Sequence, residues 1–429
     1  MLVDTKQQKH LVLNRRFNKE NRLGGMERNH AQRRTHLAPT GIQGKSAVLL
    51  PRQRQEFSRL SGTSSRASKA SSIPSPRDDN KQRKLVLHFD ARNTVLVADT
   101  VTQIGVKEAF NSYLTGVMWG YEKDNGDWQW VRDTPSLTSP ASGAITYYKH
   151  RERELVRTPS DRGELRRVTG SFTQEPLGER FLPYLERGLA SIRWTHAEHV
   201  DQLIMVDKDG EKYHYLLPSV FQVIQHLQDT KRDFSIVIRT YGSDAPNILK
   251  TIAASLEGKH PDFPRLTKMP VDHHIGTIKR HADGKITLQT ELDGNAQTLT
   301  NERQIYNFLS SCKGVTAIVD DFIYWQKNDY DHTCSKPHWV DTSDRHTQHI
   351  IFDDNLRVTD RDSIVDLRRF QGNQQRASSV LDLDLMQRYE NACLVQADLL
   401  ESTANLNYFV DKIKLCERRY DELLNSPAS

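Results

Sequence analysis

KLVLHFDARNT, residues 84–94, is the part of the sequence that says most about the fold. A short run that is apolar at almost every position ends in Asp90, and Thr94 follows four residues later. Nearly continuous apolar runs are typical of strands in parallel sheets that helices cover on both faces. Ligands of such sheets bind outside the carboxyl ends of the strands. The sequence therefore predicts a buried parallel strand whose last residue, Asp90, lies at a ligand-binding edge.

A second apolar run repeats this arrangement. The segment FSIVIRTYG, residues 234–242, contains Thr240 near its end. It follows residues 217–228, whose apolar positions recur at helical spacing. Thr240 is therefore predicted at the same sheet edge as Asp90. The alternative for Thr240 is a hydroxyl that bonds only to the local backbone, as strand-end hydroxyls often do.

A third apolar run, HIIFDDN at residues 349–355, ends in Asp353 and Asp354. Lys336 precedes it in the segment CSKPHW, residues 334–339. In chain order, the polar residues predicted at this edge are thus an aspartate, a threonine, a lysine and a pair of aspartates. A solvated surface position is the alternative for Lys336, since most lysines are exposed.

This order of residues resembles the haloacid dehalogenase-like (HAD) hydrolase superfamily, in which four motifs meet at the ends of parallel strands. The resemblance implies a Rossmannoid α/β core with an inserted cap. It implies that Asp90 is a nucleophile that forms an aspartyl-phosphate, that Thr240 binds phosphate and that Lys336 offsets negative charge. It also implies that Asp90, Asp353 and Asp354 hold Mg²⁺. The expected activity is that of a Mg²⁺-dependent phosphatase or phosphotransferase.

The chemistry of phosphoryl transfer suits these residue types independently of the family. A phosphoryl group carries distributed negative charge, so attack by a carboxylate requires nearby positive charge, and catalysis depends mostly on positioning and electrostatic stabilisation. Mg²⁺ is usually bound through one or two carboxylates and several waters. Carboxylates at strand ends together with a lysine therefore fit a phosphorylated small molecule or a phosphoprotein as the partner.

Arg92 departs from the family pattern. Hydrolytic members usually have a second aspartate two residues after the nucleophile, and in this chain that position is Arg92. Arginine stays protonated and cannot act as a general acid or base at ordinary pH. Arg92 is predicted instead to bind phosphate through its planar guanidinium. The alternative is a non-catalytic HAD-like binding or interaction protein.

A second acidic pair competes for the metal site. Asp320 and Asp321 follow the apolar run at residues 315–319. Asp353 and Asp354 are preferred because they come after Lys336, as the resemblance requires. The alternatives for Asp320 and Asp321 are that they support the site residues, face a substrate or are simply solvated, and the solvated role is favoured because strands commonly end in polar residues.

The cysteines and histidines give little support for a zinc site. The four cysteines contain no C-x-x-C pair, which suits a reducing compartment. Cys334 lies between His332 and His338, but a fourth ligand at credible spacing is missing. Neither a P-loop nor a G-x-G-x-x-G motif is present in the sequence.

The positions of the motifs divide the chain. About 150 residues separate Asp90 from Thr240, far more than one crossover helix needs, so an inserted module is expected. The expected organisation is a disordered basic tail (1–84), a first core strand (85–100), an inserted cap (101–216), core (217–256), a second insertion (257–300), core (301–375) and a C-terminal helical segment (376–429).

Both insertions contain hairpin signals. In residues 116–131, aromatic strands flank Asn125-Gly126, and residues 273–292 alternate around Asp283-Gly284. Residues 145–156 suggest a further strand that passes into a charged segment. The second insertion is expected to form a lid or an interaction surface.

Aromatic residues of the first insertion and apolar residues near the C-terminus have predicted packing roles. The tryptophans at 119, 128 and 130 are candidates for a substrate-facing wall, although hairpin packing is favoured. A helix within residues 403–424 is expected to pack on the core through Leu406, Phe409, Ile413 and Leu424.

The basic character of the protein comes from its N-terminal part. Residues 1–84 contain 19 Lys and Arg but 6 Asp and Glu, a net charge of +13, which leaves −8 for the remainder. This segment is rich in Ser and lacks apolar periodicity, so it is predicted to be disordered. An acidic partner such as nucleic acid would suit its charge, but a solvated tail without a partner is favoured.

The chain lacks the patterns of secreted and membrane proteins. Neither an apolar secretory segment near the N-terminus nor a run of 18 apolar residues is present. The expected location is cytoplasmic, with nuclear and mitochondrial locations as alternatives, and the sequence does not indicate an oligomeric state.

Overall fold

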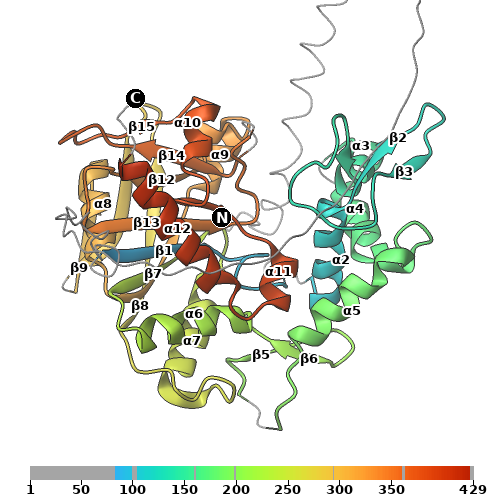
Figure 1. Ribbon diagram of the computed structural model, residues 1–429, viewed down its shortest axis with the longest axis horizontal. Helices are drawn as coiled ribbons and strands as arrows, with labels where there is room; N and C mark the ends of the chain where they lie inside the picture. Colours follow the sequence, from blue (N-terminus) through green and yellow to red (C-terminus); the bar gives the residue numbers. More distant parts are fainter. Residues whose placement is uncertain are drawn as a thin grey trace, which may run out of the picture. The chain divides into compact units, whose positions relative to one another are not determined.

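The computed structural model describes residues 83–98, 104–158, 161–197, 200–292, 294–359 and 363–425. These residues form a mixed α/β fold around an eight-stranded, mostly parallel sheet, which confirms the predicted fold class at this level (Figure 1). In spatial order the strands are β10 (Asn295–Leu299), β9 (Ile286–Leu292), β8 (Val271–Arg280), β11 (Gly314–Val319), β7 (Phe234–Thr240), β1 (Lys84–Asp90), β13 (Thr347–Asp353) and β16 (Leu394–Gln396).

The middle of this sheet has the topology of a doubly wound fold. The neighbouring strands β11, β7, β1, β13 and β16 are all paired in parallel. Numbered by their order in the chain, these five strands have the spatial order 3-2-1-4-5. The direction of winding reverses between β1 and β13, and ligands of such sheets bind in the crevice at this reversal. The fold therefore predicts a ligand site at the carboxyl ends of β1 and β13.

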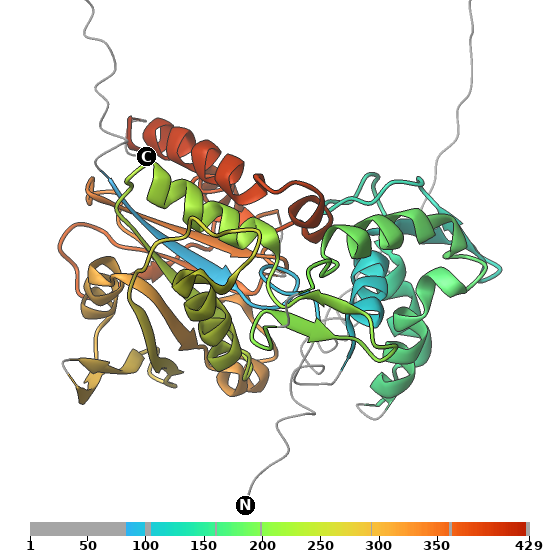
Figure 2. The ribbon, with the colours of Figure 1, turned by 90° about the horizontal axis from the view of Figure 1, so that it is seen from below.

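Helices lie on both faces of the sheet. One face is covered by α6 (Pro218–Asp229), α7 (Ala245–Ala254) and α12 (Tyr408–Asn425), which share one apolar core with the strands (Figure 2). The other face packs against α8 (Glu302–Ser311). A strand between two such layers must be apolar on both sides.

The sequence of β1 meets this requirement. Leu85 and Phe89 are fully buried in the core with α6, α7 and α12, whereas Val86 is fully buried in the core with α8. Successive side chains of a strand point to opposite faces of the sheet, so a run without alternation is buried on both. The apolar run that ends at Asp90 thus fixes β1 in the centre of the sheet.

A small second sheet lies beside the core containing α8. It consists of β12 (Lys336–Val340), β14 (Val365–Arg369) and β15 (Ser378–Ser379), and Trp339 of β12 is buried in that core. The short elements near it are α9 (Phe322–Lys327), η8 (His332–Cys334) and α10 (Leu383–Arg388), whereas α11 (Leu399–Ala404) packs beside α5 and α12.

The module between β1 and α6 has its own secondary structure. Its elements are α2 (Val106–Val117), β2 (Trp119–Glu122), β3 (Trp128–Trp130), β4 (Ile145–Thr146), α3 (Tyr147–Leu155), α4 (Arg162–Gly170), η5 (Phe172–Gln174), η6 (Glu179–Phe181), α5 (Leu182–Ser191), β5 (Ile204–Val206) and β6 (Lys212–His214).

The predicted hairpin of this module is confirmed. β2 and β3 pair in antiparallel fashion, and Gly126 in their turn has a φ of 83°, a conformation that glycine adopts without steric cost. The charged segment predicted to follow a strand is instead helix α3, which Thr146 caps by accepting a hydrogen bond from the Lys149 N–H.

The tryptophans of the hairpin pack on their neighbours. The ring centroids of Trp128 and Trp130 lie 5.4 Å apart, and both rings contact Tyr147. The Trp119 Nε1–H donates to the Ser136 carbonyl over 2.8 Å. These contacts support the packing role favoured for the three tryptophans.

The expected second insertion at residues 257–300 is not a separate lid. Its hairpin around Asp283-Gly284 is present as β8 and β9, which pair in antiparallel fashion. However, β8 also pairs in parallel with β11, so β8, β9 and β10 extend the central sheet. The unpaired backbone groups at the edge of β11 favour pairing with a further strand. The hairpin pattern of β8 and β9 does not reveal that β8 is this strand.

The expected helical segment at residues 376–429 also contains strands. β16 pairs in parallel with β13 and forms the edge of the central sheet, and β15 belongs to the small sheet. A strand of three residues, such as β16, is too short to produce a periodic signal.

The C-terminal helix α12 packs mostly as predicted. Phe409 and Ile413 are buried in the main core, and Leu424 packs against a neighbouring cluster. Leu406 is 45 % exposed and does not anchor the helix. It lies before the first residue of α12, Tyr408, and therefore outside its helical repeat.

The boundary of the basic tail lies slightly earlier than predicted. Lys84 is the first residue of β1, and its Nζ donates to the Ser310 carbonyl over 2.8 Å. Arg83 is buried and pairs with Asp421 at 2.9 Å. The rest of the predicted tail, residues 1–82, lies outside the described residues.

The length and composition of a helix determine whether it can cross a bilayer. In the part of the chain that the structure describes, no helix combines the length and the apolar composition needed to cross a membrane.

Candidate functional site

Asp90 is held at the sheet edge by its strand and by a tight turn. It is the last residue of β1, and its side chain is 13 % exposed. In the turn, the Ala91 carbonyl accepts hydrogen bonds from the Val95 and Leu96 N–H groups, and Asn93 has a φ of 57°. Asparagine tolerates this left-handed conformation better than most residues. The buried strand and the turn together fix the position of the Asp90 carboxylate.

Asp353 lies beside Asp90 because of the register of the two strands. β13 pairs in parallel with β1, and Phe89 is aligned with Phe352. The residues that follow, Asp90 and Asp353, therefore lie at the same level. Asp353 is fully buried, and Asp354 is the next residue in the chain. The strand order thus brings the predicted nucleophile and the predicted metal ligands to the same place.

Lys336 lies between two of these carboxylates. It is the first residue of β12, and its Nζ donates to Asp90 Oδ1 over 2.5 Å and to Asp353 Oδ2 over 2.7 Å. Burial alone would lower the pKa of Lys336, but Asp353 and Asp90 raise it above its ordinary value. Lys336 is therefore a buried cation that offsets part of the charge of the carboxylates, which agrees with its predicted position.

The carboxylates are close enough to share a cation. Asp90, Asp353 and Asp354 each offer an oxygen, and these three atoms lie within 4.8 Å of one another. Burial and the neighbouring charges of Asp353 and Asp90 raise the pKa of Asp354 to about 7. The raised pKa indicates negative charge that Lys336 does not fully offset. Oxygen ligands in this arrangement fit Mg²⁺. Asp90, Asp353, Asp354 and Lys336 are called the acidic cluster below.

Hydrogen bonds orient the outer carboxylate of the acidic cluster. Asp354 Oδ2 accepts from Asn93 Nδ2 over 3.0 Å, and Oδ1 accepts from Asn355 Nδ2 over 3.0 Å. Asp353 Oδ1 accepts from the Asn355 N–H at the same distance. Side chains that are held in this way keep the geometry of a site defined before a ligand binds.

Thr240 reaches the predicted edge but has a local hydrogen bond. Its strand β7 pairs with β1 so that Asp90 is aligned with Arg239, and Thr240 is the next residue. The Thr240 Oγ1 accepts from the Gly242 N–H over 2.9 Å. The structure therefore places Thr240 one position beyond the level of Asp90, with the backbone contact that the alternative anticipated.

Arg92 lies near the inserted module. It belongs to the turn after Asp90 and forms an isolated bridge with Leu96. Burial raises the pKa of Tyr148 in α3 to about 12, and the positive charges of Arg162 and Arg92 oppose this rise. The Arg92 guanidinium is thus close enough to α3 to act on a side chain of the insertion.

The rival pair Asp320 and Asp321 has structural roles, and the solvated role favoured from the sequence is wrong for the buried Asp320. Asp320 forms a fully buried ion pair with Arg239, with distances of 2.6 and 2.9 Å. Asp321 caps helix α9 by accepting from the Tyr324 N–H, and it also accepts from the Arg280 N–H. Neither belongs to the acidic cluster, which supports the preference for Asp353 and Asp354.

The trio of His332, Cys334 and His338 does not form a metal site. His338 is buried in β12 with its ring beside that of His88, at a centroid distance of 5.1 Å. Within the described residues, candidate metal-binding groups are the acidic cluster and a group of His214, His260 and Asp262. The latter was not predicted from the sequence.

Two residues beside the acidic cluster, Tyr241 and Asn93, were not predicted from the sequence as part of the site. The Lys336 Nζ lies 5.1 Å from the ring centroid of Tyr241, a cation–π contact. Asn93 orients Asp354, as described above. An asparagine in a turn directly after a strand is a recognisable signal, because asparagine favours such turns. The position of Tyr241 directly after Thr240 carries no comparable signal.

Comparisons with known proteins do not identify relatives. No model of a protein family matches the chain, and neither curated proteins nor solved structures give a significant match. The resemblance to HAD-like hydrolases therefore remains a prediction that depends on the residues themselves.

Proposed function

We propose that this protein is a HAD-like phosphatase or phosphotransferase that uses Mg²⁺ and forms an aspartyl-phosphate at Asp90. The observation that carries the proposal is the acidic cluster at the carboxyl ends of β1 and β13. It lies where the winding of the sheet reverses, the usual ligand site of this topology.

The charges of the acidic cluster suit a phosphoryl substrate once a cation is present. Three carboxylates and one lysine leave a net negative charge, which would repel a phosphate. Mg²⁺ held by Asp90, Asp353 and Asp354 would offset this charge and polarise the phosphoryl group. Lys336 lies within hydrogen-bond distance of Asp90 and would stabilise charge that develops during the attack.

The transfer step would proceed in line. An Asp90 carboxylate oxygen forms a bond to phosphorus while the bond from phosphorus to the leaving-group oxygen breaks. The leaving oxygen takes its proton from water, because Arg92 cannot supply one. Water or an acceptor hydroxyl then attacks the phosphorus of the aspartyl-phosphate and restores the Asp90 carboxylate. A phosphatase uses water in this second step, and a phosphotransferase uses a hydroxyl.

Thr240 and Arg92 would bind the phosphate oxygens in this proposal. Thr240 lies at the same sheet edge as Asp90, and Arg92 follows Asp90 by two residues. The effect of the Arg92 charge on the pKa of Tyr148 in α3 supports a role for residues 101–216 as a cap. The substrate would be a phosphorylated small molecule or a phosphoprotein, and the protein would act in the cytoplasm.

The alternative is a HAD-like protein that binds a phosphorylated partner without turnover. Arg92 is the observation that favours it, because the usual general acid contributes about 10²- to 10⁴-fold to the rate. Arg92 would then retain the phosphate through bidentate hydrogen bonds.

The experiment is a measurement of Mg²⁺-dependent phosphate release from a panel of phosphoesters. The wild type is compared with Asp90→Asn and Arg92→Asp, and Asp321→Asn is the control because it changes a strand-end aspartate outside the acidic cluster. Turnover in the wild type that is lost in Asp90→Asn supports the enzyme. Turnover in Arg92→Asp alone indicates a site that binds but lacks its acid. Absence of turnover in every variant favours the binding protein.

A further inference from the structure

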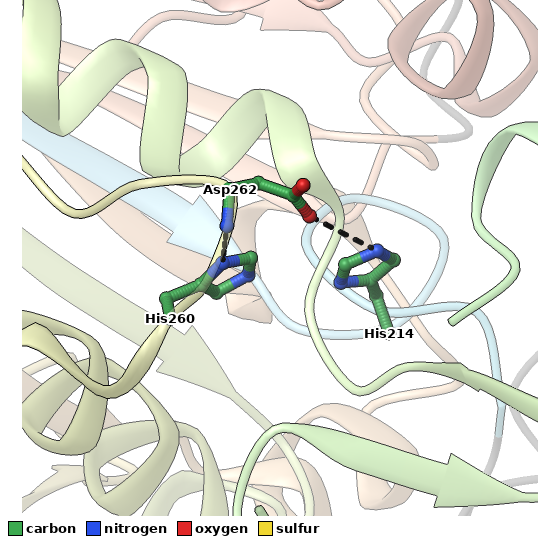
Figure 3. A group of neighbouring side chains, drawn as sticks. All are labelled: His214, His260 and Asp262. Atoms are coloured by element: carbon green, nitrogen blue, oxygen red, sulfur yellow. Dashed lines mark hydrogen bonds and ion pairs between the residues drawn. The ribbon is translucent and has the colours of Figure 1, made fainter. Parts of the chain in front are cut away.

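A group of histidines and one aspartate lies apart from the acidic cluster. His214 ends β6, and His260 and Asp262 follow η7 (Ser255–Lys259) (Figure 3). One potential ligand atom from each lies within 4.8 Å of the other two. His196 adjoins them, and its Nε2 is 2.9 Å from Asp262 Oδ1. These four residues are called the histidine cluster below.

The spacing between His214 and Asp262 fits a shared cation better than a direct hydrogen bond. His214 Nε2 and Asp262 Oδ2 are 3.7 Å apart, which exceeds the range of a hydrogen bond. Two ligands that bind Zn²⁺ at its usual distances in tetrahedral geometry lie roughly 3.3–3.6 Å from each other. A small contraction would therefore allow both atoms to bind one ion.

Buried ring nitrogens lack partners at this place. Among the described residues, no hydrogen-bond partner is present for His260 Nε2 or for His214 Nδ1, although both atoms are buried. His260 is 1 % exposed. Its Nδ1 accepts from the Asp262 N–H over 3.3 Å, so Nε2 is the ring nitrogen available to an ion. Buried polar atoms are normally satisfied, so these nitrogens indicate a missing partner.

The carboxylate of the histidine cluster is accessible from solvent. The carboxylate of Asp262 is 40 % exposed, which leaves room for a water ligand.

We propose that His214, His260 and Asp262 bind a structural transition-metal ion, Zn²⁺ in particular, and that His196 orients the Asp262 carboxylate or completes the coordination. Imidazole nitrogens with a carboxylate select zinc and its neighbours over Mg²⁺, which prefers oxygen ligands. This site is independent of the phosphoryl-transfer site proposed above.

The consequence of such an ion would be to join parts of the chain that are far apart in sequence. His196 follows α5, and the His214 N–H donates to the Ile192 carbonyl, so these two segments already lie together. His260 and Asp262 come from the chain that leaves α7. The ion would therefore fix the last hairpin of the inserted module to the core, directly before α6.

The experiment uses the full-length protein after removal of metals by a chelator. Co²⁺ is added as a spectroscopic probe, and Zn²⁺ affinity is measured by competition. The expected result is one equivalent of Co²⁺ with the intense visible absorption of a tetrahedral site, displaced by Zn²⁺. Asp262→Asn and His260→Gln should remove this absorption, and His196→Ala should weaken Zn²⁺ binding about 10- to 100-fold, as for a residue that orients a ligand.

Two control variants make the result specific. His274→Ala removes an exposed histidine of β8 and should bind Co²⁺ as the wild type does. Asp353→Asn changes the acidic cluster and should leave the visible absorption of the tetrahedral Co²⁺ site unchanged. Loss of binding in Asp353→Asn with retention in Asp262→Asn would overturn the proposal, because the ion would then occupy the acidic cluster.

A further measurement does not depend on the folding of variants. X-ray absorption of the zinc-loaded wild type should detect at least two imidazole ligands. A wild type that binds no Co²⁺ in tetrahedral geometry, or a zinc environment without imidazole, would also overturn the proposal. Failure here leaves the phosphatase proposal unaffected, since that depends on Asp90.

Discussion

Two pairs of aspartates follow apolar strands of the same sheet, yet their surroundings differ. Asp353 and Asp354 end β13 and belong to the acidic cluster with Lys336. Asp320 and Asp321 follow β11, where one pairs with Arg239 and the other caps α9.

The difference between the pairs arises from strand order. β13 is paired with β1, the strand of Asp90, whereas β11 is separated from β1 by β7. A carboxylate that lies beside Asp90 joins a group with excess negative charge. A carboxylate two strands away is instead offset by the arginine of the strand between them. The same local pattern therefore gives a candidate metal site in one place and an internal ion pair in the other.

The largest change in the free energy of unfolding is expected when Asp320 loses its partner Arg239. Arg239→Met should lower the free energy of unfolding by about 3–5 kcal/mol, because it leaves a fully buried carboxylate without its partner. Urea unfolding measures this change. The double substitution Arg239→Met with Asp320→Leu is the matched control and should recover most of the loss, since an apolar pair of similar volume is tolerated. A loss below about 1 kcal/mol in the single variant would remove the contrast between the pairs.

The next largest change is the stabilisation expected from Mg²⁺ bound by Asp353 and Asp354. Mg²⁺ at 100 times its dissociation constant should raise the free energy of unfolding of the wild type by about 2.7 kcal/mol, because it binds only the folded state. Thermal unfolding with and without Mg²⁺ measures the shift. Asp353→Asn should abolish it, and Asp321→Asn should retain it. An equal shift in both variants would show that the pairs do not differ in this respect.

A smaller effect is expected at Asp321. Asp321→Ala should lower the free energy of unfolding by about 1 kcal/mol, because helix α9 loses its N-terminal cap and the Arg280 N–H loses an acceptor. Asp321→Asn is the control, since asparagine caps helices about as well as aspartate and loses only the contact with the Arg280 N–H, because its amide has one acceptor oxygen. Chemical unfolding compares the two variants, and a similar loss in both would argue against the capping role.

The smallest change in the free energy of unfolding at neutral pH is expected for Asp354→Asn. The lost hydrogen bond, worth about 1 kcal/mol, is offset by relief of repulsion from Asp353 and Asp90, so the net change should be less than about 1 kcal/mol.

The pH dependence of this variant is more informative than its stability at one pH. The pKa of Asp354 is raised from 3.8 to about 7 in the folded state. Between these values the unfolded chain has released a proton that the folded chain retains, so the contribution of Asp354 to stability falls as pH rises through this window. Asp354→Asn should remove that part of the slope when unfolding is measured without divalent cations. A slope equal to that of the wild type would contradict the raised pKa.

The strands that carry the acidic cluster could be predicted from the sequence alone. The apolar runs that end at Asp90, Thr240 and Asp353 are local patterns, and each forms a buried strand with the predicted residue at its end. The helix before β7 and both hairpins follow from equally local spacing and turn residues. Local patterns suffice here because side-chain periodicity and turn conformation depend on neighbouring residues.

The positions of these elements relative to one another could not be predicted from the sequence and are visible in the folded chain. The tertiary structure distinguished Asp353 from Asp320 through the strand order, and it brought β8 and β16 into the central sheet. It also assembled the histidine cluster from segments around His196, His214 and His260, none of which has a motif of its own. Strand order and such clusters depend on pairing and packing between residues distant in the chain, and a local pattern contains no information about those partners.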